Sequence, residues 1–495
     1  MHSRRKSGVL LHPTSLPGPG GIGSLGEECR RFIDDLRRGG QSLWQVLPLG
    51  PAGFGNSPYS CYSAFAGNPL LIDLETLVEE GDIDEKDLQT GFSDELVDFS
   101  RVEAYKIDIL GRAADNFHTS GDTLRKEEFR HFSESTQWLN DYALFMAIKA
   151  AHHGKNWRQW PEEIAHRMPA ALEEYSCSLA PAVGMQKYMQ WQFFRQWEKV
   201  RKFANTSGIN IIGDIPIFVA YDSADVWGNP HLFHLDECGR PLVVAGVPPD
   251  YFSETGQLWG TPLYNWEVTA FHGFSWWVER MKSALLLYDR VRIDHFRGFE
   301  AYWEVPATEK NAVNGRWVKG PGESLFNALI DNLGPLPVIA EDLGVITPDV
   351  VALRDRFGFP GMKILQFAFD SGPSNSYLPH NHERHAVVYT GTHDNDTTVG
   401  WFAALSAAER KNVLDYLDSD GDDISWDLIR ATLASVADTA IIPMQDLLSL
   451  DSSARMNLPG SPSGNWTWRF RSGEFNDRII GRLLHLTDLY GRKRL

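Results

Sequence analysis

Short apolar runs rich in β-branched residues recur along the chain, and most are separated by helical patterns such as Leu25–Arg38 and Leu325–Asn332. Continuous apolar runs are typical of parallel strands that are buried on both faces. The eight runs are Gly8–Leu11, Leu43–Leu47, Asn210–Phe218, Val291–Phe296, Pro337–Glu341, Met362–Phe367, Ala386–Thr390 and Thr439–Ile442.

Strands that alternate with helices place the chain in the α/β class and predict a parallel sheet. Eight such strands favour a closed (β/α)8 TIM barrel. A doubly wound open sheet is the alternative, and the strand number makes it the less favoured one.

The uneven spacing of the runs predicts insertions within one elaborated barrel domain that spans residues 1–495. Residues 52–205 carry helical patterns, which predict an inserted and largely helical subdomain. Residues 220–285 are rich in Gly, Pro and aromatic residues. We expect them to form an ordered loop, rather than helix, over the active site. The stretch after Ile442 is short, so we expect no separate C-terminal β-domain.

The charge of the chain narrows the class of ligand. The sequence has 47 Lys and Arg against 65 Asp and Glu, a formal net charge of −18. A surface this acidic repels nucleic acids and anionic membranes. No run approaches the roughly 18 apolar residues of a membrane helix. We therefore expect a neutral or cationic ligand, with no nucleic acid and no membrane as partner.

The cysteines and tryptophans add two further indications. Four cysteines without a Cys-x-x-Cys pair predict neither a zinc site nor a disulfide framework, and they favour the cytoplasm. The sequence contains 17 tryptophans. Core packing explains many of them, and a sugar-binding surface is the functional alternative. We expect a monomer or a small homo-oligomer.

Four predicted strands end in acidic residues: Asp214, Asp294, Glu341 and Asp394. In a parallel barrel the carboxyl ends of the strands carry the active site. One acid after a strand is usually a turn residue or a helix cap. Four acids at one end repel one another, which favours a metal site, hydroxyl binding or acid–base chemistry.

The spacing of these acids permits glycosidic bond cleavage with retention, which requires two carboxyl groups about 5–5.5 Å apart. Neighbouring strands lie about 4.7–4.9 Å apart, so Asp294 and Glu341 can meet. Arg292 lies on the same strand face as Asp294 and would keep it ionised, although a purely structural ion pair is equally compatible. Glu341 could stay protonated, and Asp394 beside His393 could hold sugar hydroxyls.

Three motifs resemble the catalytic blocks of the α-amylase clan: Arg-Ile-Asp-His-Phe-Arg-Gly around Asp294, Ile-Ala-Glu-Asp-Leu-Gly around Glu341, and Gly-Thr-His-Asp-Asn-Asp-Thr around Asp394. More narrowly, the chain resembles the amylomaltase (4-α-glucanotransferase) family over nearly its whole length. Further blocks carry this likeness: Asn56–Tyr59, Ser63–Pro69, Gly213–Val219, Asp222–Trp227, Pro248–Phe252, Trp259–Gly260 and Arg455–Asn457 through Gly464–Trp466.

By position, the resemblance implies that Asp294 is the nucleophile, Glu341 the general acid/base and Asp394 the transition-state stabiliser. It implies that the residues supporting the sugar at the cleaved bond are Arg292, His393 and Asp214. It implies that the residues lining the glucan path are Tyr59, Tyr251, Phe252, Trp259, Gln257 and Asn465.

The implied reaction moves α-1,4-glucan segments from a donor to the 4-hydroxyl of an acceptor glucan or glucose, through a covalent β-glucosyl-aspartate. No cofactor and no metal are implied. Transfer exceeds hydrolysis only if water is excluded from the intermediate. We expect the aromatic segment Tyr251–Trp266 to form that barrier.

Residue types alone also permit a metal-dependent isomerase or lyase on the same fold. The candidate ligands would be Asp214, Asp294, Glu341, Asp342, Asp394, His295 and His393. Arg292 and Arg297 flank Asp294 and would repel a cation, which disfavours this alternative.

Three other interpretations carry less weight. The histidine-rich segment 380–385 precedes a predicted strand and is more typical of a solvated turn than of a metal site. Residues 18–23 fit Gly-x-Gly-x-x-Gly, but the acidic residue that a dinucleotide site needs after the second strand is missing. A non-catalytic carbohydrate-binding protein would use the aromatic rings and leave the acids idle.

Overall fold

The computed structural model describes residues 5–120, 122–249, 253–461 and 463–493, and its centre is an eight-stranded parallel sheet. The strand order is β10-β11-β12-β1-β2-β3-β6-β9. The strands are β1 (Lys6–Leu10), β2 (Leu43–Gln45), β3 (Asn210–Pro216), β6 (Arg290–Asp294), β9 (Val338–Ala340), β10 (Gly361–Ile364), β11 (Ala386–Tyr389) and β12 (Thr439–Pro443). All eight predicted strands lie in this one sheet.

The sheet curls until its two outermost strands meet. The backbone N–H of Ala340, the last residue of β9, donates to the carbonyl of Pro360 just before β10, at 3.0 Å. The predicted TIM barrel is therefore confirmed. After β12 the described chain continues in short turns and two helices, α17 (Met444–Leu447) and α18 (Asp477–Leu489).

Amphipathic helices cover the barrel. Helix α1 (Glu27–Arg38) buries Cys29, Phe32, Ile33 and Leu36, which recur at the spacing of one helical face. The other helices that follow barrel strands are α12 (Glu323–Leu333), α13 (Pro348–Arg356), α14 (Thr398–Ala404), α15 (Ala407–Leu417) and α16 (Ile424–Ala434).

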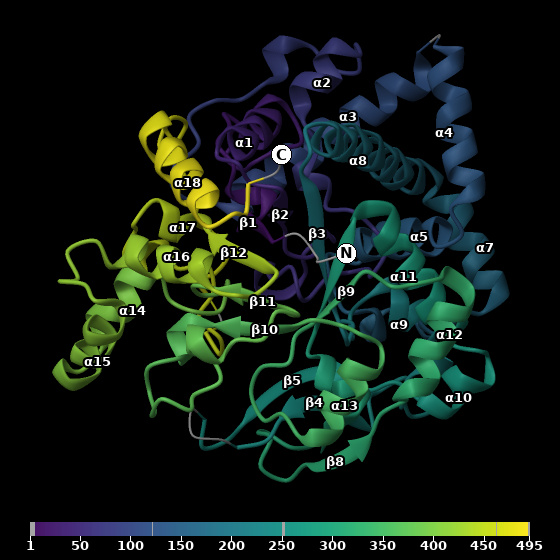
Figure 1. The fold of residues 1–495 in the computed structure, drawn as a ribbon. Helices are drawn as coiled ribbons and strands as arrows, with labels where there is room; N and C mark the ends of the chain where they lie inside the picture. The colour runs from purple at the N-terminus through teal and green to yellow at the C-terminus, as the bar shows by residue number, and fades with distance from the viewer. Residues whose placement is uncertain (1–4, 121, 250–252, 462, 494–495) are drawn as a thin grey trace.

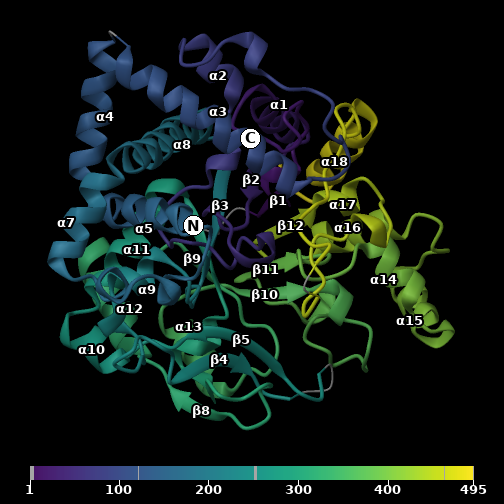
Figure 2. The ribbon, with the colours of Figure 1, turned by 180° about the vertical axis from the view of Figure 1, so that it is seen from behind.

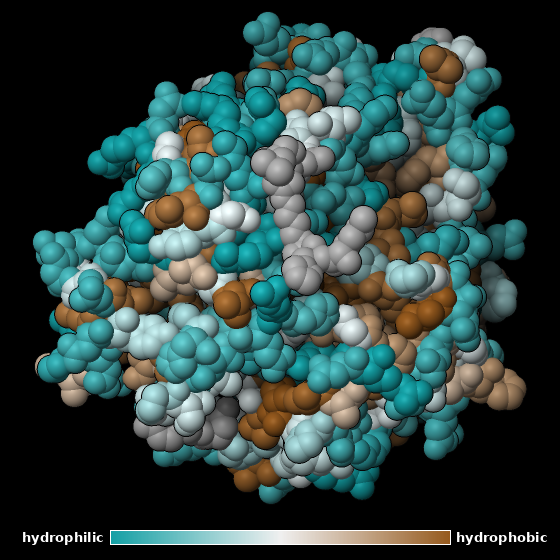
Figure 3. All heavy atoms as spheres, in the orientation of Figure 1, coloured by the Kyte–Doolittle hydropathy of each residue, from teal (hydrophilic) through white to brown (hydrophobic). Residues whose placement is uncertain are grey.

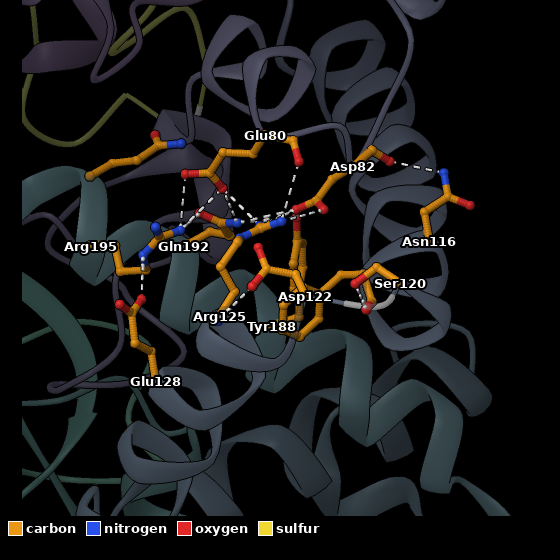
Figure 4. A network of polar contacts seen from close by, with 12 residues as sticks. Glu80, Asp82, Asn116, Ser120, Asp122, Arg125, Glu128, Tyr188, Gln192 and Arg195 are labelled. Carbon is orange, nitrogen blue, oxygen red and sulfur yellow. Dashed lines mark hydrogen bonds and ion pairs between the residues drawn. The ribbon is translucent and has the colours of Figure 1, made fainter.

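The long segment between β2 and β3 forms a group of helices on one side of the barrel, opposite α14 and α15 (Figures 1 and 2). Its helices are α2 (Leu74–Glu79), α3 (Phe99–Thr119), α4 (Thr123–Ser135), α5 (Leu139–Ala151), α6 (Glu162–Ala165), α7 (Pro169–Ser178) and α8 (Ala180–Thr206). A buried polar network, drawn in Figure 4, joins α4 and α8 to the turn after α2.

The segment between β3 and β6 is not a loop, and in this respect the prediction is wrong. It holds α9 (Ala224–Gly228), β4 (Val243–Val247), β5 (Gln257–Pro262), α10 (Trp266–Phe271) and α11 (Ser275–Leu287). Helix α11 buries Trp277, Met281 and Ala284, a helical spacing that the density of aromatic residues and glycines obscured.

Strands β4 and β5 also join a second sheet, which the sequence analysis did not predict. They pair antiparallel with β7 (Ala301–Pro306) and β8 (Arg316–Lys319), in the order β5-β4-β7-β8. Figures 1 and 2 place this sheet beside the barrel, below its strands in both views.

The surface is largely polar. In Figure 3 hydrophilic residues cover most of the visible face, and hydrophobic residues form small separate groups. Among the described residues, no helix combines the length and apolar character needed to span a bilayer.

Candidate active site

Asp214, Arg292 and Asp294 form a chain of charges at the carboxyl ends of β3 and β6. The two strands pair so that Asp214 lies opposite Arg292. One guanidinium nitrogen of Arg292 contacts Asp214 Oδ2 at 2.6 Å, and another contacts Asp294 Oδ1 at 2.9 Å. The expected side-by-side position of Arg292 and Asp294 on their strand thus produces a direct ion pair.

Asp214 is buried and only partly satisfied. Its Oδ2 also accepts a hydrogen bond of 2.9 Å from the Tyr59 hydroxyl. Its Oδ1 is buried and has no hydrogen-bond partner among the described residues. Burial raises the pKa of Asp214 to about 7, although Arg292 opposes this shift. An unpaired buried carboxylate oxygen is costly, and the Asp214 side chain has no exposed surface.

Glu341 follows β9 and lies beside Asp294. The strands β6 and β9 pair Ile293 with Ala340, so the next residues along the chain, Asp294 and Glu341, are neighbours at the barrel rim. The Glu341 carboxylate accepts backbone N–H bonds from His295 at 2.7 Å and Leu343 at 2.9 Å.

The environment of Glu341 favours its protonated form. Burial, and then the negative charge of Asp294, raise the pKa of Glu341 to about 8. His295 adopts a left-handed backbone conformation with φ 53° directly after the strand. This strained turn is what aims the His295 N–H at Glu341, and strain of this kind is typical of functional sites.

Asp394 and His393 lie in the turn after β11. Asp394 Oδ1 accepts a hydrogen bond of 2.7 Å from the Asn457 side chain, and the Asp394 carbonyl accepts one of 2.6 Å from Arg455. These two bonds fix the Asp394 backbone and one carboxylate oxygen. The side chain is still half-exposed. Burial lowers the pKa of His393, which favours a neutral imidazole.

Aromatic rings surround His393. Its ring stacks on Tyr59 with centroids 5.0 Å apart and planes 16° apart. Trp466 packs against both rings, at 6.0 Å from Tyr59 and 5.9 Å from His393. The structure thereby brings Tyr59 and His393 together, as the resemblance implies for two residues of one site.

Trp259 and Gln257 lie on β5, at the other side of the loop that follows Asp294. The Trp259 indole donates to Gln257 Oε1 at 3.1 Å. The ring of Trp259 contacts His295 edge-on, with centroids 4.8 Å apart. These contacts join β5 to the loop that follows Asp294 and begins at His295. Tyr251 and Phe252 lie outside the described residues.

Asn465 differs from the other predicted contacts because its amide braces its own loop. It accepts from the Leu458 N–H at 2.9 Å and donates to the Ser461 carbonyl at 3.0 Å. Its neighbour Trp466 is the residue that packs against Tyr59 and His393. Arg455, Asn457 and Trp466 lie in sequence blocks that resemble the family, but no role was predicted for them.

The described residues contain no group of three or more His, Cys, Asp or Glu side chains arranged to hold a metal ion. In the histidine-rich segment, His380 contacts the Tyr416 hydroxyl, His382 contacts Ser435, and His385 contacts the Gly358 carbonyl. Each of these histidines thus has a separate protein partner.

Comparisons with known proteins agree with this geometry. A family model described as 4-alpha-glucanotransferase matches residues 11–474. A 4-alpha-glucanotransferase of Thermus thermophilus is 53% identical over 492 residues, 98% of each chain. One of Synechocystis is 52% identical over 500 residues, 100% of this chain and 99% of that one. The solved structure of an amylomaltase from Streptococcus agalactiae in complex with acarbose is similar with a TM-score of 0.97, 39% identity, and coverage of 99% and 100% of the two chains.

Proposed function

The chain belongs to the 4-alpha-glucanotransferase family, and from that premise we propose that it transfers α-1,4-glucan segments with retention, through a covalent ester on Asp294. The proposed donors are maltodextrins and fragments of starch or glycogen. The proposed acceptors are the 4-hydroxyls of other glucans or of free glucose. Four free cysteines fit the reducing cytoplasm that we propose as its location.

In the first step Asp294 attacks C1 of a glucosyl unit. The ion pair with Arg292 orients the carboxylate and stabilises its charge. The Asp294 side chain is 29% exposed, so it reaches the space where substrate binds. The bond from C1 to the leaving oxygen breaks as the bond from C1 to Asp294 forms, which gives a β-linked ester.

Glu341 supplies the proton for this step. Its raised pKa keeps the acid protonated near neutral pH. The proton passes to the leaving oxygen, so the departing glucan leaves as an alcohol and Glu341 becomes a carboxylate. The same carboxylate then removes the proton from the acceptor 4-hydroxyl, which attacks C1 and restores the α-1,4 bond.

We assign hydroxyl binding to Asp394, while the fully buried Asp214 supports the site through its contacts with Arg292 and Tyr59. Asp394 holds its carboxylate toward solvent, fixed by Asn457. Bonds from sugar hydroxyls to such carboxylates strengthen as the ring becomes an oxocarbenium ion.

Transfer rather than hydrolysis requires that the acceptor, and not water, meets the ester. Trp259 lies against His295, next to Asp294, and is our candidate for excluding water there. The single observation that carries the proposal is that Asp294, which ends β6 and is paired to Arg292, lies beside Glu341, which directly follows β9.

The test is to incubate the pure protein with maltotriose alone and to separate the products. A transferase yields free glucose together with a series of longer maltodextrins. A product mixture of glucose and maltose without longer chains would instead identify a hydrolase, and no conversion would refute the enzymatic role.

A further inference from the structure

Two tryptophans have a larger exposed fraction than the rest. Of the 17 tryptophans in the chain, the exposed ones are Trp259 and Trp317, at 37% and 41%. They occupy the two edge strands of the four-stranded sheet, Trp259 on β5 and Trp317 on β8. The proposed reaction gives a role to the first and none to the second.

Both tryptophans contact the loop that follows Asp294. Trp259 contacts His295, the next residue. Trp317 lies over Arg297, two positions further on, with the guanidinium carbon 3.8 Å from the ring centroid. Trp317 is therefore connected to the catalytic loop through a single side chain.

The ring of Trp317 is held rigidly. Arg297 is buried, covers one face of the ring and donates a hydrogen bond to the Val345 carbonyl. Trp303, the partner of Trp317 across β7 and β8, packs against its edge with centroids 5.2 Å apart and planes 68° apart. The Trp303 indole is fixed in turn by a 2.9 Å bond to the Ala312 carbonyl. A ring fixed in this way loses little conformational freedom when a ligand stacks on it.

The surroundings of Trp317 combine apolar and polar groups. Val345, whose carbonyl accepts from Arg297, and Val313, which follows the Ala312 that accepts from Trp303, are exposed at 56% and 47%. On β8 itself, the exposed cations Arg316 and Lys319 lie on either side of Trp317. An exposed apolar surface with a charged rim marks a binding site.

We propose that Trp317 is a stacking platform for a glucose unit of a long α-1,4-glucan, at a distance from the bond that is cleaved. This inference rests on the proposed function. The flat apolar ring suits the C–H face of a neutral sugar, and Lys319, two residues along β8 and on the same face, can donate to its hydroxyls. Arg297 links the platform to the loop after Asp294, so one long glucan could reach both the platform and the active site. A donor that spans both places binds with an avidity that a trisaccharide cannot reach.

The test compares long-chain amylose with maltotriose as donor. We expect Trp317→Ala to lower the ratio of kcat/KM for amylose to kcat/KM for maltotriose by about threefold to tenfold, the range expected for loss of one aromatic contact. Trp317→Phe keeps a flat ring and should restore most of the ratio. Phe271→Ala, which removes a ring that is 85% exposed on α10, is the matched control and should leave the ratio unchanged.

Two results would overturn the platform. An equal loss with both donors would mean that Trp317 supports Arg297 and the catalytic loop rather than the glucan. No change with either donor would mean that no sugar binds there. A wild-type protein that forms no longer chains from maltotriose would instead overturn the proposed function. Calorimetry with maltoheptaose on wild type and Trp317→Ala would then still decide whether Trp317 binds a glucan.

Discussion

Two regions of this molecule place a buried arginine between two carboxylates, and they use it differently. In the helical segment, Arg125 bonds to Glu80 and Asp82 (Figure 4). At the barrel rim, Arg292 bonds to Asp214 and Asp294. The residue types are nearly the same, so the difference lies in what surrounds them.

In the network around Arg125 the carboxylates are fully paired, although Arg125 Nε is buried without a partner among the described residues. Every carboxylate oxygen of Glu80 and Asp82 accepts at least one hydrogen bond, with Tyr188, Gln192 and Arg195 as the additional donors. Burial tends to raise the pKa of Glu80, but the bonds from Gln192 and Arg195 outweigh it and leave this pKa lowered. The network is therefore a structural one, with its charges matched to each other.

The network around Arg292 is incomplete. Asp214 Oδ1 is buried without a partner among the described residues, and Asp294 is partly exposed. Glu341 lies near enough to Asp294 that the charge of Asp294 raises its pKa. A site that leaves charge unmatched in the free protein can match it when the substrate reacts. The contrast teaches that an unpaired carboxylate oxygen and a partly exposed acid, rather than buried charge itself, distinguish the functional network from the structural one.

The largest expected effect separates the two regions directly. Asp294→Asn should lower turnover of maltotriose by about 10⁴-fold or more, because the nucleophile is lost. It should lower the melting temperature less than Asp82→Asn does, because Asp294 is partly exposed and Arg292 keeps its bond to Asp214. Asp82→Asn is the reciprocal variant: it should keep turnover and lower the melting temperature. Product analysis and calorimetric melting check both. Activity and stability falling together in either variant would break the distinction.

The next effect concerns stability alone. Arg125→Met leaves the buried Asp82 without a cationic partner, while Glu80 keeps Arg195, and it should cost about 3–5 kcal/mol in the free energy of unfolding. Turnover per folded molecule should stay unchanged. Arg130→Met, on the same helix but with a side chain that is 66% exposed, is the control and should change the unfolding free energy little. Urea unfolding measures both variants. Equal stabilities for the two would mean that the network is not structural.

The pH dependence sharpens the catalytic half of the comparison. Because the pKa of Glu341 is raised to about 8, the acid is protonated below that pH and ionised above it. The rate constant kcat for maltotriose should therefore decline as the pH rises above about 8, approaching a tenfold fall per pH unit. The melting temperature over the same range controls for unfolding. A rate that stays level up to about pH 10 would contradict the assignment of Glu341 as the acid.

The smallest effect tests how the site treats water. Trp259→Ala should increase the ratio of hydrolysis to transfer severalfold, because water gains access beside His295 and Asp294. The measurement is the amount of reducing sugar released relative to the longer maltodextrins formed. Phe271→Ala, at the end of α10 in the same segment between β3 and β6, serves again as the control. An unchanged ratio would remove Trp259 from this role.

The barrel could be predicted from the sequence because its strands leave a strong local signal. Runs such as Asn210–Phe218 and Thr439–Ile442 are buried on both faces, so they are mostly apolar. The second sheet left a weak signal. Strand β8 is short, mostly exposed and polar, and β4 contains Gly246. Tertiary pairing rather than local propensity creates these strands.

The same distinction applies to the site. Asp214, Asp294, Glu341 and Asp394 could be found because each lies within, at the end of, or shortly after a strand that the pattern revealed. Arg125 could not be placed between Glu80 and Asp82, because that contact depends on how α4 packs. Nor could the amide of Asn465 be assigned to its own loop, because only the local turn geometry determines this.

The most direct test of the central claim is to trap the ester on Asp294. In Glu341→Gln, a maltosyl fluoride donor needs no acid to release fluoride, and the missing base prevents the second step. Mass spectrometry of the digested protein should then find a maltosyl group on the peptide that contains Asp294. An adduct on another residue, or steady release of fluoride without any adduct, would contradict the account.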